Sequence, residues 1–291
     1  MAKTFEQFHF SLIERDQPDL LEAKMSREDW LRAKFGVRFD FQHQGKPFSW
    51  VPQNWAGDYV VGIIERQKFH VVRTPPNDGA AEIEGSFWTG SMVVIDPRNI
   101  PGGQGVAVEA NSNVGQPSAI LSSLVGHMNA ILPHQYAIQF KALFEGGSFW
   151  RFAERHGGQL EYVRFKFTVP NMIFGAGGGV KQGLRRIGSD TNAQEIEVKI
   201  ESAEGIDANS EAVKEGVAYG EEGNASVTAK SLNGDRWSST KQKMTAKVQS
   251  VLDLPKAKVE EVQEWLKQAL NREQDSSDSG FDNPDDWHRD N

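Results

Sequence analysis

Cysteine is absent from the 291-residue chain, which excludes disulfide bonds, thiolate metal ligands and a cysteine nucleophile. No apolar run approaches the length of about eighteen residues that a membrane-spanning helix needs. The first ten residues, MAKTFEQFHF, lack the basic start and the apolar stretch of a secretory signal. We therefore expect a cytoplasmic protein.

Nucleotide-binding and metal-binding motifs are also missing. The stretch FGAGGGVKQGLRR (residues 174–186) has a glycine cluster before a basic segment, as a phosphate-binding loop does. However, Gln182 follows Lys181 where that loop requires serine or threonine, and no third glycine completes a dinucleotide motif. No two of the seven histidines have the spacing of helical metal ligands. We predict no cofactor, no metal and no catalytic residue.

The composition is that of a folded protein with more than one domain. Hydrophobic residues make up 38% of the chain, including 8 Trp and 17 Phe, which is sufficient for a buried core. The length favours two domains. Short alternating runs between residues 37 and 97 predict an antiparallel sheet, and the apolar spacing of residues 117–132 predicts an amphipathic helix.

The second half predicts a smaller α+β unit. LEYVRFKFTVP (160–170) alternates polar and apolar residues as a half-buried strand does, and further elements follow in the order βαβαββ. PKAKVEEVQEWLKQALNRE (255–273) predicts a terminal helix. The predicted fold class is α+β, with a sheet-rich domain over 1–158, a predicted DNA-binding domain over 159–272 and an acidic disordered tail over 273–291.

Charge is distributed unevenly along the sequence. The formal net charge is −8, yet residues 271–291 account for −5 of it, and residues 226–250 carry +4. Because docking depends on the local field and not on the sum, an acidic chain can still present a basic face. The overall charge therefore does not exclude nucleic acid as a partner.

The basic segment 226–250 is the most informative stretch. Its Asn233–Gly234 pair predicts a hairpin turn, with lysines, hydroxyls and Trp237 beside it, which are groups that hold phosphates and stack on bases or sugars. An exposed sheet edge that avoids aggregation carries similar lysines. The glycine loop likewise fits either backbone contact with phosphate or a mobile connection. The candidate DNA-binding residues are Arg164, Lys166, Lys181, Arg185, Arg186, Lys230, Arg236, Trp237, Lys241, Lys243 and Lys247.

Two alternatives remain open. EIEVKIES places Glu195, Glu197 and Lys199 on one strand face, a pattern shared by metal-dependent nucleases and by solvated strands. The first half would serve as a protein–protein interaction module if its aromatic side chains were exposed, although a core position is the stronger interpretation for them. These aromatic residues are Trp50, Trp55, Phe87 and Trp88.

The order of elements around VRFKFTVPNMIFG, EIEVKIES and TAKSLNGD resembles RexA-type phage-exclusion proteins and, more distantly, the KwaB component of Kiwa anti-phage systems. The resemblance implies a non-catalytic DNA-binding protein in anti-phage defence that senses phage replication, forms a homo-oligomer and works with a separate membrane-protein partner. On this analogy, the DNA backbone would contact Arg164, Lys166, Lys230, Arg236, Lys241 and Lys243.

Overall fold

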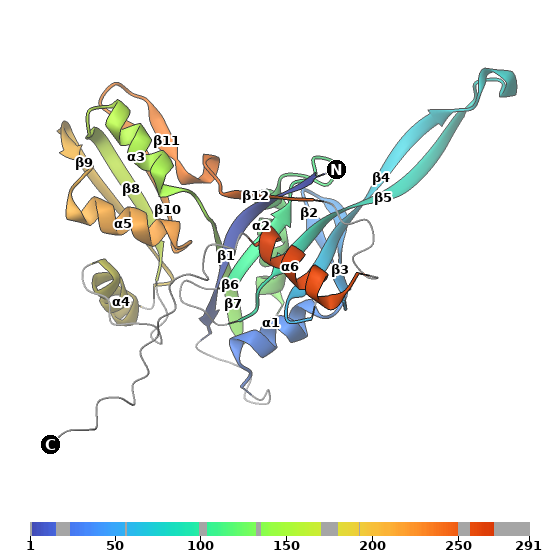
Figure 1. Ribbon diagram of the computed structural model, residues 1–291, viewed down its shortest axis with the longest axis horizontal. Coiled ribbons are helices and arrows are strands. Elements are labelled where there is room, and N and C mark those ends of the chain that lie inside the picture. The colour runs from blue at the N-terminus through green and yellow to red at the C-terminus, as the bar shows by residue number, and fades with distance from the viewer. Residues whose placement is uncertain are drawn as a thin grey trace.

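The computed structural model describes residues 2–15, 24–55, 57–98, 104–131, 135–169, 180–191, 193–249 and 257–270. Two antiparallel sheets with helices form a mixed α+β architecture, which confirms the predicted fold class (Figure 1). The predicted tail over 273–291 and the glycine loop up to residue 179 lie outside the described residues. None of the described helices has the length and apolarity that crossing a bilayer requires.

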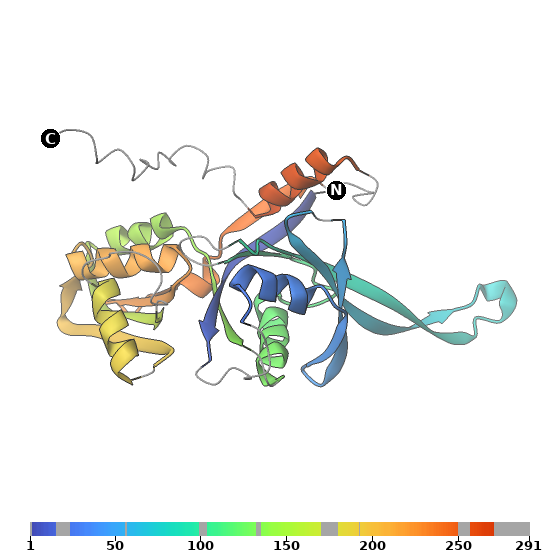
Figure 2. The same cartoon turned by 90° about the horizontal axis from the view of Figure 1, so that it is seen from below.

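The large sheet has eight strands in the order β12-β1-β6-β5-β4-β3-β2, and β7 also pairs with β1. Helices α1 and α2 cover one face, and α6 covers the other (Figure 2). The strands are β1 (Ala2–Glu14), β2 (Phe39–His43), β3 (Lys46–Gln53), β4 (Val60–Arg73), β5 (Glu82–Ile95), β6 (Gln104–Glu109), β7 (Tyr136–Ala142) and β12 (Thr245–Gln249). The helices are α1 (Arg27–Phe35), α2 (Pro117–Ala130) and α6 (Val259–Ala269), with a short 3-10 turn η1 (Pro76–Asp78) between β4 and β5.

Strand β1 is central to this sheet, although no strand is predicted there from the sequence. Its side chains are buried on both faces: Phe8 and Phe10 belong to the core beneath α1 and α2, whereas Phe5 packs against Trp265 of α6 with ring centroids 5.5 Å apart. Gln7 is also buried, and its side chain donates to the backbone oxygen of Ala269 at 2.7 Å. This bond satisfies a polar group that would otherwise be costly to bury.

The small sheet has four strands in the order β11-β10-β8-β9. Its apolar face packs on α3 and α5 (Figure 1), while its other face carries polar side chains. Helix α5 approaches closely at Gly216, because a side chain there would meet the ring of Phe165 at 2.6 Å. The elements are α3 (Gly146–Arg155), β8 (Gln159–Thr168), α4 (Val180–Thr191), β9 (Glu195–Asp207), α5 (Glu211–Glu221), β10 (Ala225–Ser231), β11 (Arg236–Ser238) and the 3-10 turn η2 (Ser239–Lys241).

The chain crosses between the two units twice. Phe149 of α3 lies in the core of the small sheet, so this unit begins before the expected boundary at residue 158. After η2 the chain returns, β12 pairs with β1, and α6 packs on the large sheet. Strand β12 and helix α6, which were expected to complete the second domain up to residue 272, therefore belong to the unit of the large sheet.

Candidate nucleic-acid interface

Four of the predicted DNA-binding residues share one surface. In an antiparallel sheet, directly opposed residues lie on the same face, and Arg164 of β8 is opposed by Thr228 of β10 and Lys199 of β9. Lys230 of β10 is likewise opposed by Arg236 of β11. We name this surface the polar face. It consists of Tyr162, Arg164, Lys166, Glu195, Glu197, Lys199, Glu201, Ser226, Thr228, Lys230, Arg236 and Ser238.

The polar face follows from strict alternation in the strands that form it. In β10, Ser226, Thr228 and Lys230 are half-buried on this side, while Ala225 and Val227 are fully buried beneath α5. Strand β8 repeats the pattern, with Arg164 exposed. Ser226 and Thr228 were not among the predicted contacts, but the period of two in the sequence places them on this face.

Cations and carboxylates are interleaved on the polar face. The Nζ atom of Lys166 lies 2.6 Å from Glu195, and Nε of Arg164 lies 3.6 Å from Glu197. Lys230 bonds to Glu161 at 2.6 Å. With Glu161 counted, the face holds five cations and four carboxylates and has a net charge of +1, in contrast to the whole chain at −8.

Glu195 links the polar face to the first unit. Its carboxylate accepts from Lys166 and, at 2.7 Å, from Lys141 of β7. Partial burial raises the pKa of Glu195, but the hydrogen bonds from Lys141 and Lys166 outweigh this effect and leave the pKa below its usual value. Glu195 is thus ionised at neutral pH and is held by two ammonium groups.

Arg236 differs from its neighbours on the polar face. It is exposed on β11, the edge strand of the small sheet, and no ion pair of its guanidinium is found within the described part of the chain. Ser238, two residues further, shares a hydrogen bond of 2.9 Å with Thr240. Guanidinium and hydroxyl groups at an open edge are well placed to donate to phosphate oxygens.

Trp237 is buried and does not take the exposed position predicted for a DNA contact. Its indole is only 6% exposed and packs against Phe144 and Phe149, with ring centroids 5.5 and 5.3 Å away. Since Arg236 points to the polar face, the alternation of β11 sends Trp237 into the core. Trp237 therefore stabilises the small unit and does not stack on a base.

The basic segment 226–250 does not form one continuous surface. Lys241 is exposed in η2. Lys243 lies between η2 and β12, is mostly buried and bonds to Glu6 of β1 at 2.6 Å, so it anchors this connecting segment to the large sheet. Lys247 is exposed on β12 in the large sheet, opposite Thr4. Lys243 and Lys247 therefore lie away from the polar face, and their prediction as members of one contact surface is wrong.

The basic residues after the glycine loop lie on α4. This helix contacts α5 and contributes Leu184 to the core of the small unit, so it is separate from the polar face. Arg186 is exposed there. Lys181 and Arg185 belong to the same helix, and their side chains lie outside the described structure.

The nuclease alternative gains no support from the geometry. Glu195, Glu197 and Lys199 do share a face of β9, but the two carboxylates are engaged by lysine and arginine side chains. Within the described ranges, no three His, Asp or Glu side chains converge in a way that could hold a metal ion. The carboxylates act here as partners of the cations.

The aromatic residues of the interaction-module alternative divide into two groups. Trp50 is fully buried, and its indole nitrogen donates to the backbone oxygen of Phe35, as expected for a core residue. Trp55 packs at the edge of the core beneath α6. In contrast, Phe87 and Trp88 are 44% and 53% exposed on β5, so the core interpretation is wrong for these two.

No protein-family model matches the chain, and comparisons with curated proteins and with solved structures find no significant match either. The resemblance to RexA-type proteins consequently stays a prediction.

Proposed function

We propose that the chain binds DNA through its phosphate backbone, using the polar face of the small sheet. The observation that supports this proposal is the small local excess of cations, interspersed with hydroxyl groups, on a sheet face that none of the described helices covers. Phosphate contacts position a protein on DNA without reading the sequence, so we expect weak sequence preference.

The ion pairs on the polar face are compatible with exchange for phosphate. Arg164 and Lys166 have side chains that are 44% and 48% exposed, and their carboxylate partners are similarly accessible. Exposed ion pairs contribute only about 0–1 kcal/mol each. A phosphate oxygen can therefore replace Glu197 beside Arg164 at small cost, while the carboxylates keep the affinity moderate.

The proposal includes no catalytic step. Lysine and arginine hold phosphate through charge and hydrogen bonds, so binding should need no metal ion. A role in anti-phage defence, with phage replication as the trigger and a membrane protein as partner, rests on the family resemblance alone. DNA binding can be tested without assuming that role.

The test is a salt series of binding to a labelled duplex, with EDTA and with magnesium, followed by a gel that reveals cutting. The variant Arg164→Ala/Arg236→Ala should reduce the salt slope of log K by about 0.9 for each phosphate that is no longer neutralised. The matched control is Arg151→Ala/Lys214→Ala, which removes two exposed cations from α3 and α5 on the opposite side.

The control variant should bind like the parent protein. Equal losses in both variants would contradict the proposal, because the effect would then follow net charge and not the polar face. No binding at low salt would overturn it as well. Cutting that requires magnesium would instead favour the nuclease alternative.

A further inference from the structure

Helix α6 lies beside β1, and its last turn is held at the junction between the two units (Figure 1). The side chain of Gln7 donates to the backbone oxygen of Ala269 at 2.7 Å, and the backbone nitrogen of Gln7 donates to the oxygen of Met244 at 3.0 Å. The backbone oxygen of Gln7 accepts from Leu143 at 2.9 Å. Leu143 and Met244 belong to the two segments that cross to the small unit. The end of α6 is therefore close to both crossings.

A cationic edge of the small sheet begins just before Met244. Lys241 of η2 and Arg236 of β11 are exposed, and between them Ser238 and Thr240 share a hydrogen bond of 2.9 Å. Across the residues that the structure describes, no salt bridge to Arg236 or Lys241 is found. We name Arg236, Ser238, Thr240 and Lys241 the basic edge.

The carboxylates of the polar face lie away from the basic edge or are neutralised. Three of the four lie on β9, the opposite edge strand of the small sheet: Glu195, Glu197 and Glu201. The fourth, Glu161, is bonded to Lys230 at 2.6 Å. Asp235, which precedes the basic edge, lies 3.5 Å from His156 at the end of α3. The basic edge is therefore more positive than the polar face as a whole.

The chain continues past α6 with an acidic segment. Residues 275–286, DSSDSGFDNPDD, contain five aspartates and no lysine, arginine or histidine. They follow the last described residue, Leu270, after a spacer over 271–274. Carboxylates accept charge-assisted hydrogen bonds from the same guanidinium and ammonium groups that hold phosphate. The acidic segment and the basic edge are thus complementary in charge and in hydrogen bonding.

The acidic segment is long enough to reach the basic edge. The contacts of Gln7 and the run of chain from Arg236 to Met244 place Arg236 at most about 45 Å from Ala269, since an extended chain spans up to about 3.6 Å per residue. Residues 270–286 span up to about 55 Å on the same basis. A flexible connection of this length gives an effective concentration in the millimolar range, so individually weak contacts are sufficient.

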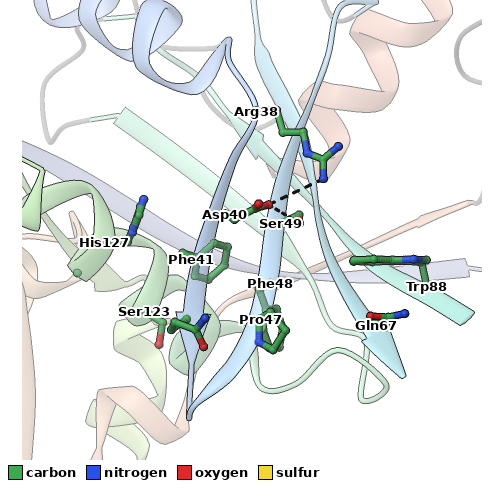
Figure 3. A pocket seen from close by; sticks show the side chains of 12 residues that line it. Arg38, Asp40, Phe41, Pro47, Phe48, Ser49, Gln67, Trp88, Ser123 and His127 are labelled. Atoms are coloured by element: carbon green, nitrogen blue, oxygen red, sulfur yellow. Dashed lines mark hydrogen bonds and ion pairs between the residues drawn. The ribbon is translucent and has the colours of Figure 1, made fainter. Parts of the chain in front are cut away.

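Other surfaces suit the acidic segment less well. A concavity of about 760 Å³ at β2 includes one cation and one carboxylate in its lining, Arg38 and Asp40, which pair at 3.9 Å (Figure 3). Strand β2 forms the edge of the large sheet opposite β12, whereas α6 ends beside β1. The exposed side of α6 itself repels an acidic chain through three carboxylates: Glu260, Glu261 and Glu264.

We propose that residues 275–286 bind the basic edge and compete there with DNA. Aspartate carboxylates take the place of phosphate oxygens beside Arg236 and Lys241. This contact needs no DNA, whereas its regulatory consequence rests on the proposed function. DNA then reaches the whole polar face only after it displaces the acidic segment, and its apparent affinity falls in proportion to the fraction of molecules in which the basic edge is free.

Cross-linking tests the contact without DNA, because the parent chain has no cysteine. Thr240→Cys combined with Asn283→Cys should form an intramolecular disulfide under mild oxidation, identified by mass spectrometry of the digested protein. The matched control combines Asn283→Cys with Arg151→Cys, since Arg151 is exposed on α3 on the opposite side of the small sheet. The first pair should link roughly tenfold faster, as binding raises its local concentration. Equal rates would overturn the proposal.

A labelled peptide of residues 271–291 tests which cations are used. The host is the full chain with the five aspartates of its own segment changed to asparagine: Asp275, Asp278, Asp282, Asp285 and Asp286. Arg236→Ala/Lys241→Ala in this host should weaken peptide binding by roughly threefold to tenfold at low salt. Arg151→Ala/Lys214→Ala removes the same number of cations and should bind the peptide like the host. No peptide binding, or equal losses in both variants, would overturn the proposal, and circular dichroism verifies folding.

Duplex binding tests the competition. The five-asparagine host should bind a labelled duplex roughly threefold to tenfold more tightly than the parent protein, because its basic edge is free. The control changes five exposed carboxylates elsewhere to glutamine: Glu84, Glu154, Glu260, Glu261 and Glu264. An equal gain in this control would overturn the competition, since the effect would then follow net charge.

Failure of this inference and failure of the proposed function are distinguishable. If the peptide binds and the cross-link forms but no duplex binds at low salt, DNA binding is contradicted and the contact of the acidic segment stands. If the duplex binds but the peptide does not, the acidic segment is contradicted and DNA binding stands.

Discussion

The polar face and the arm (residues 67–73 of β4 paired with residues 82–88 of β5) are both built from antiparallel strands, but their surface chemistry is opposite. On the polar face nearly every charged side chain has a partner of opposite sign, and Tyr162 contacts Lys199 through its ring at 5.0 Å. On the arm, Phe69 is 80% exposed. The first surface presents mostly paired charges to water, whereas the second presents apolar side chains to it.

Because of this difference, the two surfaces would bind their partners through different forces. The exposed pairs of the polar face can exchange a carboxylate for a phosphate, so binding there should be reversible and sensitive to salt. Any contact made by the arm would gain free energy by burying apolar area, which depends little on salt. Salt concentration would therefore separate binding at the two surfaces.

The largest expected effect distinguishes two tryptophans, one in each unit. Trp237→Ala should destabilise the protein by about 3–5 kcal/mol, because it leaves a cavity between Phe144 and Phe149. Trp88→Ala should change stability by about 0.5 kcal/mol or less, since its side chain is exposed. Urea unfolding measures both. A large loss in Trp88→Ala would mean that the arm packs within its own chain.

The next prediction separates the two surfaces by function. Arg164→Ala/Arg236→Ala should lower the salt slope of DNA binding by about 0.9 for each phosphate that the variant no longer neutralises, and should leave the oligomeric state unchanged. Arg73→Glu, on the ribbon of β4 and β5, should leave this slope unchanged, because Arg73 pairs with Glu82 far from the polar face. The measurements are anisotropy with a short duplex and sedimentation of the same samples. An equal loss of slope in Arg73→Glu would show that the effect follows net charge.

A smaller effect concerns the pH dependence of stability. Because the pKa of Glu195 is lowered in the folded state, its contribution is present above the unfolded carboxyl pKa near 4.5 and is lost as the pH falls through the folded pKa. Glu195→Gln should cost about 1 kcal/mol at pH 7 and nothing in acid. Urea titrations at both pH values test this, with Glu204→Gln, an exposed position on the same strand, as control.

The smallest expected effect is a gain of affinity. Glu197→Gln removes the carboxylate that competes with phosphate for Arg164, so DNA binding should strengthen by roughly twofold to fivefold. Glu154→Gln on α3 makes the same change in net charge on the helical side and serves as the control. An equal gain in both variants would show that only the total charge matters.

Local sequence patterns predict much of the fold. Ser26 is the expected amino-terminal cap, and its hydroxyl accepts from the backbone nitrogen of Asp29 at the start of α1. The alternation in residues 160–170 predicts β8 and the face on which Arg164 and Lys166 lie. These features depend on neighbours in sequence, so a single sequence contains them.

The pairing of distant segments could not be predicted in the same way. Strand β12 joins β1 through contacts nearly 250 residues apart, for example between Ala2 and Gln249. As a result Lys247 and Arg236, which lie eleven positions apart, are on different sheets. The candidate site is correspondingly smaller than the basic segment suggests.

Periodicity and capping act over a few residues, so the amino-acid sequence alone predicts the α+β class, most element positions and the polar face of β8. The burial of Trp237, the contact of Lys243 with Glu6 and the exposure of Phe87 and Trp88 on β5 follow only from the folded structure. Burial depends on which distant segments cover a side chain, and an aromatic residue looks the same in sequence whether it is buried or exposed.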